Sequence, residues 1–109
     1  MKKEEGVICD FSMFPLDKGD SLSHYVGKSL KIIAESGLAY RLGPMSTAIE
    51  GNYEECMKIV EKCFEEMSRE CNRIVLNLKM DFRRNRKNSM DSKIRSVERA
   101  TGLVLNNKE

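Results

Sequence analysis

The sequence predicts an α+β, ferredoxin-like fold with the order βαββαβ, an antiparallel sheet of strand order 4-1-3-2 and a further C-terminal helix. Residues 7–14 and 74–82 alternate apolar and polar side chains, the pattern of a strand covered on one face. Residues 21–36 and 53–71 repeat apolar side chains every three or four positions, as amphipathic helices do. A Gly-Pro pair between two short apolar runs predicts a hairpin. Two helices over one face of a four-stranded sheet would bury all of these apolar faces.

The first strand and the first helix occupy the N-terminal third of the chain. The strand at residues 7–14 places Val7, Cys9, Phe11 and Met13 on one face, and Pro15 ends it. Asp20 or Ser21 can cap the helix predicted for residues 21–36, and a Ser-Gly pair supplies its left-handed stop.

The hairpin follows, with strands predicted at Leu38 to Leu42 and at Met45 to Glu50 around Gly43-Pro44. The faces of the second of these strands are ambiguous. We assign the more apolar set, Met45, Thr47 and Ile49, to the core, which leaves Ser46, Ala48 and Glu50 on the other face. The strand order makes the strand at Leu38 to Leu42 an exposed edge.

The second helix has the strongest pattern in the chain. Asn52 and Glu55 resemble a capping box at its start. The expected packing face is the series Tyr53, Met57, Val60, Phe64, Met67 and Cys71. Full burial of such side chains would stabilise the fold by about 1.5 to 3 kcal/mol each.

A fourth strand, Ile74 to Phe82, is followed by a basic loop at residues 83–88 and a helix that begins at Ser89 and ends at Gly102. We therefore expect one domain, residues 6–102, with a charged N-terminal extension at residues 1–5 and a C-terminal tail at residues 103–109 that begins with three apolar residues.

Composition narrows the possible functions. The 109 residues suffice for one domain, and 19 Lys and Arg against 17 Asp and Glu leave a net charge of +2, which argues against a nucleic-acid-wrapping protein. No apolar run approaches a membrane span or a signal peptide, so a cytoplasmic protein is expected. The four cysteines form no C-x-x-C pair and there is one histidine, which predicts buried thiols and no zinc site.

One sheet face is left without helices, and its residues from the first and fourth strands follow from the alternation: Ile8, Asp10, Ser12, Phe14, Val75, Asn77, Lys79 and Asp81. Such a face is either solvated or covered by something other than a helix. Ile8, Phe14 and Val75 favour a covered face, because a second subunit or a flat ligand would shield them from water. We expect subunits to associate, with small polar groups near the contact.

Four stretches then resemble the YkoF-like family of small thiamine-binding proteins: FSMFPL at 11–16, ESGLAY at 35–40, GPMSTAIEG at 43–51 and DFRR at 81–84. The resemblance covers about residues 6 to 100, and the third stretch is its specific part. It implies a ferredoxin-like subunit, assembled as a homodimer or homotetramer, that binds thiamine or its hydroxymethylpyrimidine moiety without transforming it. The charged N-terminal start, the Arg-rich loop and the apolar tail depart from the family pattern.

The candidate ligand-binding residues come from two sources. The resemblance implies Ser12, Ser46, Thr47 and Glu50, and the open-face argument adds Asp10 and Asn77. An aminopyrimidine needs a carboxylate to accept its amino hydrogens and hydroxyls or amides to donate to its ring nitrogens. Glu50 has a competing role, since a carboxylate is also favoured near the start of the second helix. If Glu50 accepts a buried amino hydrogen, Glu50→Gln should cost about 1 to 3 kcal/mol of binding.

The sequence bears on three other functions. An enzyme is disfavoured because no Ser/His/Asp set, paired metal ligands or phosphate loop is present, so we predict no catalytic residue, metal or cofactor. An RNA-binding domain of this fold would carry aromatic residues on its central strands, and the strand at Met45 to Glu50 has none. An oligomeric regulatory or structural module that responds to another small metabolite remains the alternative to thiamine binding.

Overall fold

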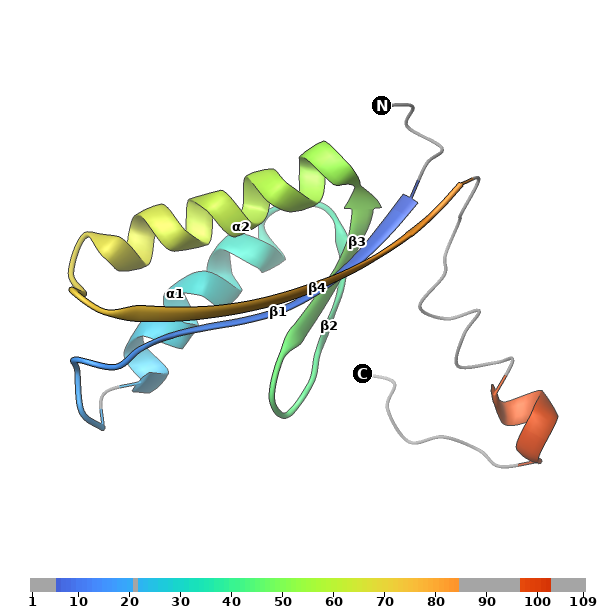
Figure 1. Cartoon of the computed structure of the whole chain (residues 1–109), viewed down its shortest axis with the longest axis horizontal. Helices are drawn as coiled ribbons and strands as arrows, with labels where there is room; N and C mark the ends of the chain where they lie inside the picture. The colour runs from blue at the N-terminus through green and yellow to red at the C-terminus, as the bar shows by residue number, and fades with distance from the viewer. Residues whose placement is uncertain (1–5, 21, 85–96, 103–109) are drawn as a thin grey trace.

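A computed structural model of the chain describes residues 6–20, 22–84 and 97–102. Its elements are β1 (Gly6–Pro15), α1 (Leu22–Ala34), β2 (Ala39–Leu42), β3 (Thr47–Asn52), α2 (Tyr53–Ser68) and β4 (Ile74–Arg83). The strands form one antiparallel sheet in the order β2-β3-β1-β4, with both helices on the same side of it (Figure 1). The ferredoxin-like fold and the strand order 4-1-3-2 are therefore confirmed.

The ends of the chain are described only in part. Residues 97–101 are helical, and the helix ends at Gly102 as predicted, with the glycine in a left-handed conformation at φ of 75°. The predicted helix start at Ser89, most of the basic loop, the extension at residues 1–5 and the tail at residues 103–109 lie outside the described residues.

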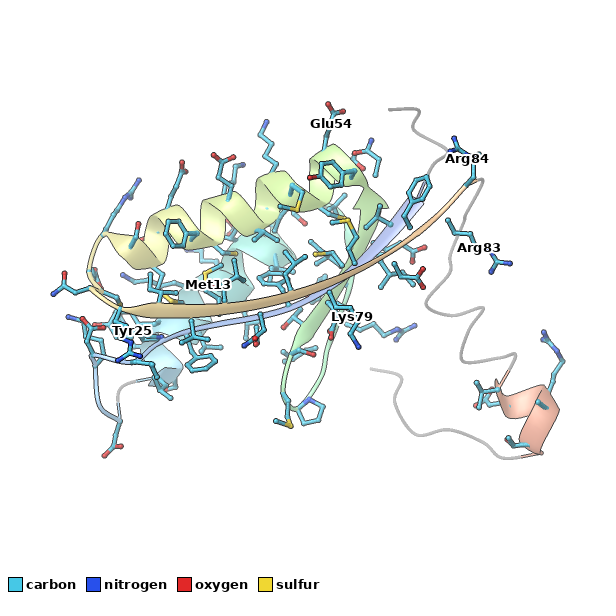
Figure 2. All side chains as sticks on the ribbon, viewed as in Figure 1. Met13, Tyr25, Glu54, Lys79, Arg83 and Arg84 are labelled. Carbon is cyan, nitrogen blue, oxygen red and sulfur yellow. The ribbon has the colours of Figure 1, made fainter. Side chains whose placement is uncertain are left out.

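The register of β1 with β4 shows which side chains share the helix-free face of the sheet, here called the open face. Four pairs stand directly opposite one another: Ile8 and Asp81, Asp10 and Lys79, Ser12 and Asn77, Phe14 and Val75. Opposed residues point to the same face of a sheet. The open face therefore carries all eight residues predicted for it, and Figure 2 shows Lys79 directed away from the helices.

The core lies between the sheet and the helices. Its largest fully buried side chains are Ile33, Ile49, Val7, Pro15, Cys9, Cys56 and Cys63. All four cysteines are buried and free, as predicted. Asn52 caps α2 as predicted: its side chain accepts a hydrogen bond from the Glu55 backbone N–H at 2.8 Å, and its backbone N–H donates to the Glu55 carboxylate at 3.0 Å.

The predicted packing face of α2 was wrong at its two aromatic positions. Tyr53 and Phe64 are 43% and 46% exposed. The helix instead buries the stripe that contains Cys56, Ile59, Val60, Cys63 and Met67. This stripe lies towards β1, β3 and α1, where the small cysteine side chains allow close approach, and the aromatic rings are displaced to its margin.

The assignment of Met45 to the core was also wrong, because its side chain is 88% exposed. The Gly43 N–H donates to the Ser46 carbonyl at 2.9 Å, so residues 43–46 form a turn and β3 begins only at Thr47. Met45 lies in this turn. Thr47 and Ile49 are buried, which confirms the rest of that assignment.

Candidate functional site

The candidate site lies at the N-terminal end of β3, where the pairing of β3 with β1 stops. The pairing of β1 with β3 stops at Phe11 opposite Thr47, whereas the pairing of β1 with β4 continues to Pro15. Within the described residues, the segment from Ser12 to Pro15 thus has a strand on one side only. The turn at residues 43–46 lies beside this gap and brings Ser46 next to β1. A hollow opens on each face of the sheet at this point.

The hollow on the open face, here called the polar hollow, has a volume of about 300 Å³. It is lined by Asp10, Phe11, Ser12, Ser46, Asn77, Leu78 and Lys79. The Ser46 hydroxyl donates a hydrogen bond to Asp10 Oδ1 at 2.7 Å, which joins the turn before β3 to the middle of β1. Both side chains are half-buried, so this bond holds two polar groups in place at the wall of the hollow.

The polar hollow brings together four of the six predicted site residues. Asp10, Ser12, Ser46 and Asn77 all line it, and the register places Asn77 directly opposite Ser12. Lys79 was not among the predicted residues, although it stands opposite Asp10 and belongs to the same alternating face. Its position two residues after Asn77 was the signal that could have found it.

The other two predicted residues lie elsewhere. Thr47 is 8% exposed and lines the hollow on the helix side of the sheet, which Ser12 and Ser46 line as well. Glu50 is on the open face, paired with Ile8 of β1 and Ala39 of β2, and is absent from the lining of both hollows. The capping box of α2 uses Asn52 and Glu55, and Glu50 lies two residues before the cap. The role expected for Glu50 at the positive end of the helix stays a prediction.

The hollow on the helix side, here called the apolar hollow, was not predicted. It has a volume of about 220 Å³ and lies between α1 and the turn at residues 43–46, against β1. Its apolar walls include Phe11, Leu30 and Ile33, and Ser29 and Thr47 add hydroxyl groups. No local sequence pattern predicts the apolar hollow, because it depends on the distance between the β2–β3 hairpin and α1.

The buried thiols next to this region are held in the protonated form. Burial raises the pKa of the Cys9 thiol to about 11, and the adjacent Asp10 carboxylate adds to this shift. Burial likewise raises the pKa of Cys56 to about 12. Thiolate chemistry at neutral pH is therefore disfavoured at both positions.

Among residues 6–20, 22–84 and 97–102, no three His, Cys, Asp or Glu side chains are grouped so that they could hold a metal ion. No helix within the same residues is long and apolar enough to cross a membrane.

Comparison with known proteins then assigns the chain to a family. A family model described as "Thiamine-binding protein" matches residues 9–98. The chain belongs to the thiamine-binding protein family. One curated member, the UPF0045 protein sll0230 of Synechocystis sp., is 34% identical over 97 residues, which are 88% of this chain and 80% of that protein.

Solved structures of similar proteins share the fold. The hypothetical protein MJ1052 of Methanocaldococcus jannaschii is 28% identical and superposes with a TM-score of 0.77, covering 84% of this chain and 95% of that one. A Thermotoga maritima protein that has been proposed to act in thiamine biosynthesis or salvage is 24% identical, with a TM-score of 0.70 and coverage of 81% and 97%. At 24% identity, the likeness to the Thermotoga maritima protein shows a shared fold.

Proposed function

We propose that this protein binds thiamine, or its hydroxymethylpyrimidine moiety, in the polar hollow and does not transform it. The observation that carries the proposal is the Asp10–Ser46 hydrogen bond, with Ser12 and Asn77 in the same hollow. Membership of a family described as thiamine-binding supports the ligand class. The proposed link of the Thermotoga maritima structure to thiamine metabolism agrees with it.

The groups in the hollow match the edge of an aminopyrimidine. The Asp10 carboxylate can accept from the exocyclic amino group, and it is already oriented by Ser46. The Ser12 hydroxyl and the Asn77 amide can donate to ring nitrogens from adjacent strands. Lys79 stands at the same wall, and its ammonium group can donate to a ring nitrogen or to a hydroxyl of the ligand. A volume of about 300 Å³ suits a small planar molecule.

We propose further that a second subunit covers this face near the site. Ile8, Phe14 and Val75 are half-buried and lie on the open face with the hollow. A partner sheet placed over them would remove apolar surface from water and would also exclude water from the hollow. Burial would strengthen the polar contacts to the ligand.

The test is titration calorimetry with thiamine and with hydroxymethylpyrimidine, comparing the wild type with Asp10→Asn. Asparagine keeps an oxygen that can accept from Ser46, so the wall should be preserved while its charge is lost. We expect binding to weaken by about 1 to 3 kcal/mol, the usual cost of losing a charge-assisted hydrogen bond. Mass spectrometry of the recovered ligand should show it unchanged.

The matched control is Asp20→Asn, an exposed aspartate that lines neither hollow, and it should leave the affinity unchanged. Glu50→Gln tests the extent of the site. A loss there as large as for Asp10→Asn would mean that the ligand reaches along β3 beyond the polar hollow. Equal affinities of the wild type and Asp10→Asn would overturn the proposed site.

A further inference from the structure

Lys79 brings a positive charge to the wall of the polar hollow. It stands directly opposite Asp10 in the register of β1 with β4, and opposite charges at such positions attract each other. Within the described residues, however, the side chain of Lys79 takes part in no ion pair and no hydrogen bond. The charge of Lys79 is therefore available to a ligand in the hollow.

The Asp10 carboxylate is engaged on the other side of β1. The Ser46 hydroxyl, which donates to Asp10 Oδ1 at 2.7 Å, belongs to the turn before β3. Because β3 and β4 flank β1 on opposite sides, this bond directs one carboxylate oxygen towards β3 and away from Lys79. The hollow thus presents a hydrogen-bond acceptor and a separate positive charge on neighbouring strands. Such a pair fits a ligand that has an amino group and an anionic group close together.

Hydroxymethylpyrimidine has this arrangement when its hydroxyl group is phosphorylated. Its amino and hydroxymethyl groups are on adjacent ring carbons, so both can meet groups at the same wall. Directly opposed residues of an antiparallel pair have Cβ atoms about 4.5 to 5.5 Å apart, which suits two neighbouring substituents. With the amino group on Asp10, a phosphate on the hydroxymethyl oxygen lies beside the flexible side chain of Lys79. In thiamine the same carbon carries the thiazolium cation, which Lys79 would repel.

We propose that the polar hollow prefers the phosphate ester of hydroxymethylpyrimidine to the free alcohol and to thiamine. The inference rests on the proposed function, because it places the pyrimidine at Asp10. A phosphomonoester carries a charge of about −1.5 to −2 at neutral pH, which Lys79 meets with a charge-assisted hydrogen bond. The Asn77 amide has two N–H groups, so it can serve a ring nitrogen and a phosphate oxygen.

The acidic residues of the neighbouring row limit where the phosphate lies. Glu50 and Asp81 stand on either side of Ile8 on the open face. Their negative charges disfavour a phosphate on that side of Lys79, whereas the uncharged Asn77 lies on the other side. The phosphate is therefore expected between Lys79 and Asn77, inside the polar hollow.

The experiment is titration calorimetry of the full chain with hydroxymethylpyrimidine, its phosphate ester, thiamine and thiamine monophosphate. We expect the phosphate of hydroxymethylpyrimidine to bind about tenfold more tightly than the free alcohol. Thiamine monophosphate should gain nothing over thiamine, because its phosphate lies beyond the thiazolium ring and away from Lys79. An equal gain for both phosphates would show unspecific attraction of anions and would overturn the proposal.

Variants of Lys79 test which group recognises the phosphate. Lys79→Gln keeps a hydrogen-bond donor but removes the charge, so it should abolish the preference for the phosphate and leave the affinity for the free alcohol almost unchanged. Lys79→Arg should retain most of the preference. Lys62→Gln removes the charge of an exposed lysine of α2 that lines neither hollow, and as the matched control it should have no effect. A preference that survives Lys79→Gln would contradict the inference.

The results separate this inference from the proposed function. If the free alcohol binds and Asp10→Asn weakens it, but the phosphate ester binds no more tightly, the proposed site stands and the role of Lys79 is wrong. If none of the four compounds binds, the proposed function itself is wrong. The preference for the phosphate should also decrease with rising salt concentration, because Lys79 is exposed and its charge is screened.

Discussion

A single hydrogen bond organises the candidate site at the scale of residues. Ser46 precedes β3 and Asp10 lies in the middle of β1, yet the two side chains meet at 2.7 Å because the turn at residues 43–46 folds back beside β1. The bond orients a carboxylate oxygen that would otherwise rotate freely in water. Orientation before binding reduces the entropy that a ligand must remove, so a small polar site gains affinity from it.

The buried thiols lead to a prediction about pH. In the unfolded chain a cysteine loses its proton near pH 9, whereas the folded state holds the protons of Cys9 and Cys56 up to about pH 11 and 12. Between these values the unfolded state binds fewer protons than the folded state, so the free energy of unfolding falls as pH rises. We expect stability to be fully present below pH 9 and to decline above it.

Urea denaturation from pH 7 to pH 11 measures this decline. Cys56→Ala should be less stable at neutral pH, because a small cavity forms, but its stability should fall less steeply between pH 9 and 11. The comparison isolates the contribution of the Cys56 thiol, because the two proteins are identical at every other position. Equal slopes for the wild type and Cys56→Ala would show that Cys56 does not contribute.

The turn between β2 and β3 matters most at the scale of elements. A Cβ atom built on Gly43 would lie 2.9 Å from the Ser46 carbonyl oxygen, which is backbone and cannot move away cheaply. The same carbonyl accepts the Gly43 N–H at 2.9 Å. The close approach of the two ends of the turn therefore requires glycine at position 43. The conformation of this turn also sets the position of the Ser46 side chain.

Gly43→Ala should accordingly weaken both the fold and ligand binding. We expect a destabilisation of about 1 to 2 kcal/mol in urea denaturation, of the size of other local backbone conflicts, and a loss of thiamine affinity measured by calorimetry. Gly27→Ala is the control, since nothing lies within 4 Å of the added Cβ in α1. It should stabilise the protein by about 0.5 to 1 kcal/mol, because alanine is the better helix former. A neutral Gly43→Ala would contradict the role given to the turn.

The apolar periodicity of α2 predicted the helix but not all of its buried side chains. Its start at Tyr53 and its capping box were predictable from Asn52 and Glu55, because capping depends on neighbours within one turn. Its buried face was predictable only in part, at Val60 and Met67, because two apolar stripes were available. The sheet selected the stripe with Cys56 and Cys63, whose small side chains permit close packing, and left Phe64 at the margin.

Ligand binding can be followed at the scale of the whole molecule through thermal stability. A ligand present at 100 times its dissociation constant adds about 2.7 kcal/mol to the stability of the folded state. For a domain of this size the melting temperature should rise by on the order of 10 °C. We expect such a rise with thiamine, its phosphates or hydroxymethylpyrimidine, and a smaller one with oxythiamine, which lacks the amino donor. No rise with any of them would favour a module that responds to another metabolite.

Spacing along the chain was enough to predict the elements of this protein, their order and the open face. The alternation through Asp10, Ser12 and Asn77 was enough to place those three side chains on one face. It could not show that Glu50 stands apart from them, nor that Thr47 faces the helices at the edge of a second hollow. The positions of Glu50 and Thr47 relative to the hollows depend on where the pairing of β3 with β1 ends, at Phe11 opposite Thr47.

Tertiary structure also decided which apolar side chains stay exposed. Leu76 and Leu78 have the alternation of a core strand, and nothing in their neighbours distinguishes them from the buried Phe11 and Met13 opposite. The difference arises because, among the described residues, the two helices cover the central strands fully and the edge strand only in part. Burial depends on position within the layer, and that position is set by contacts between segments far apart in the chain.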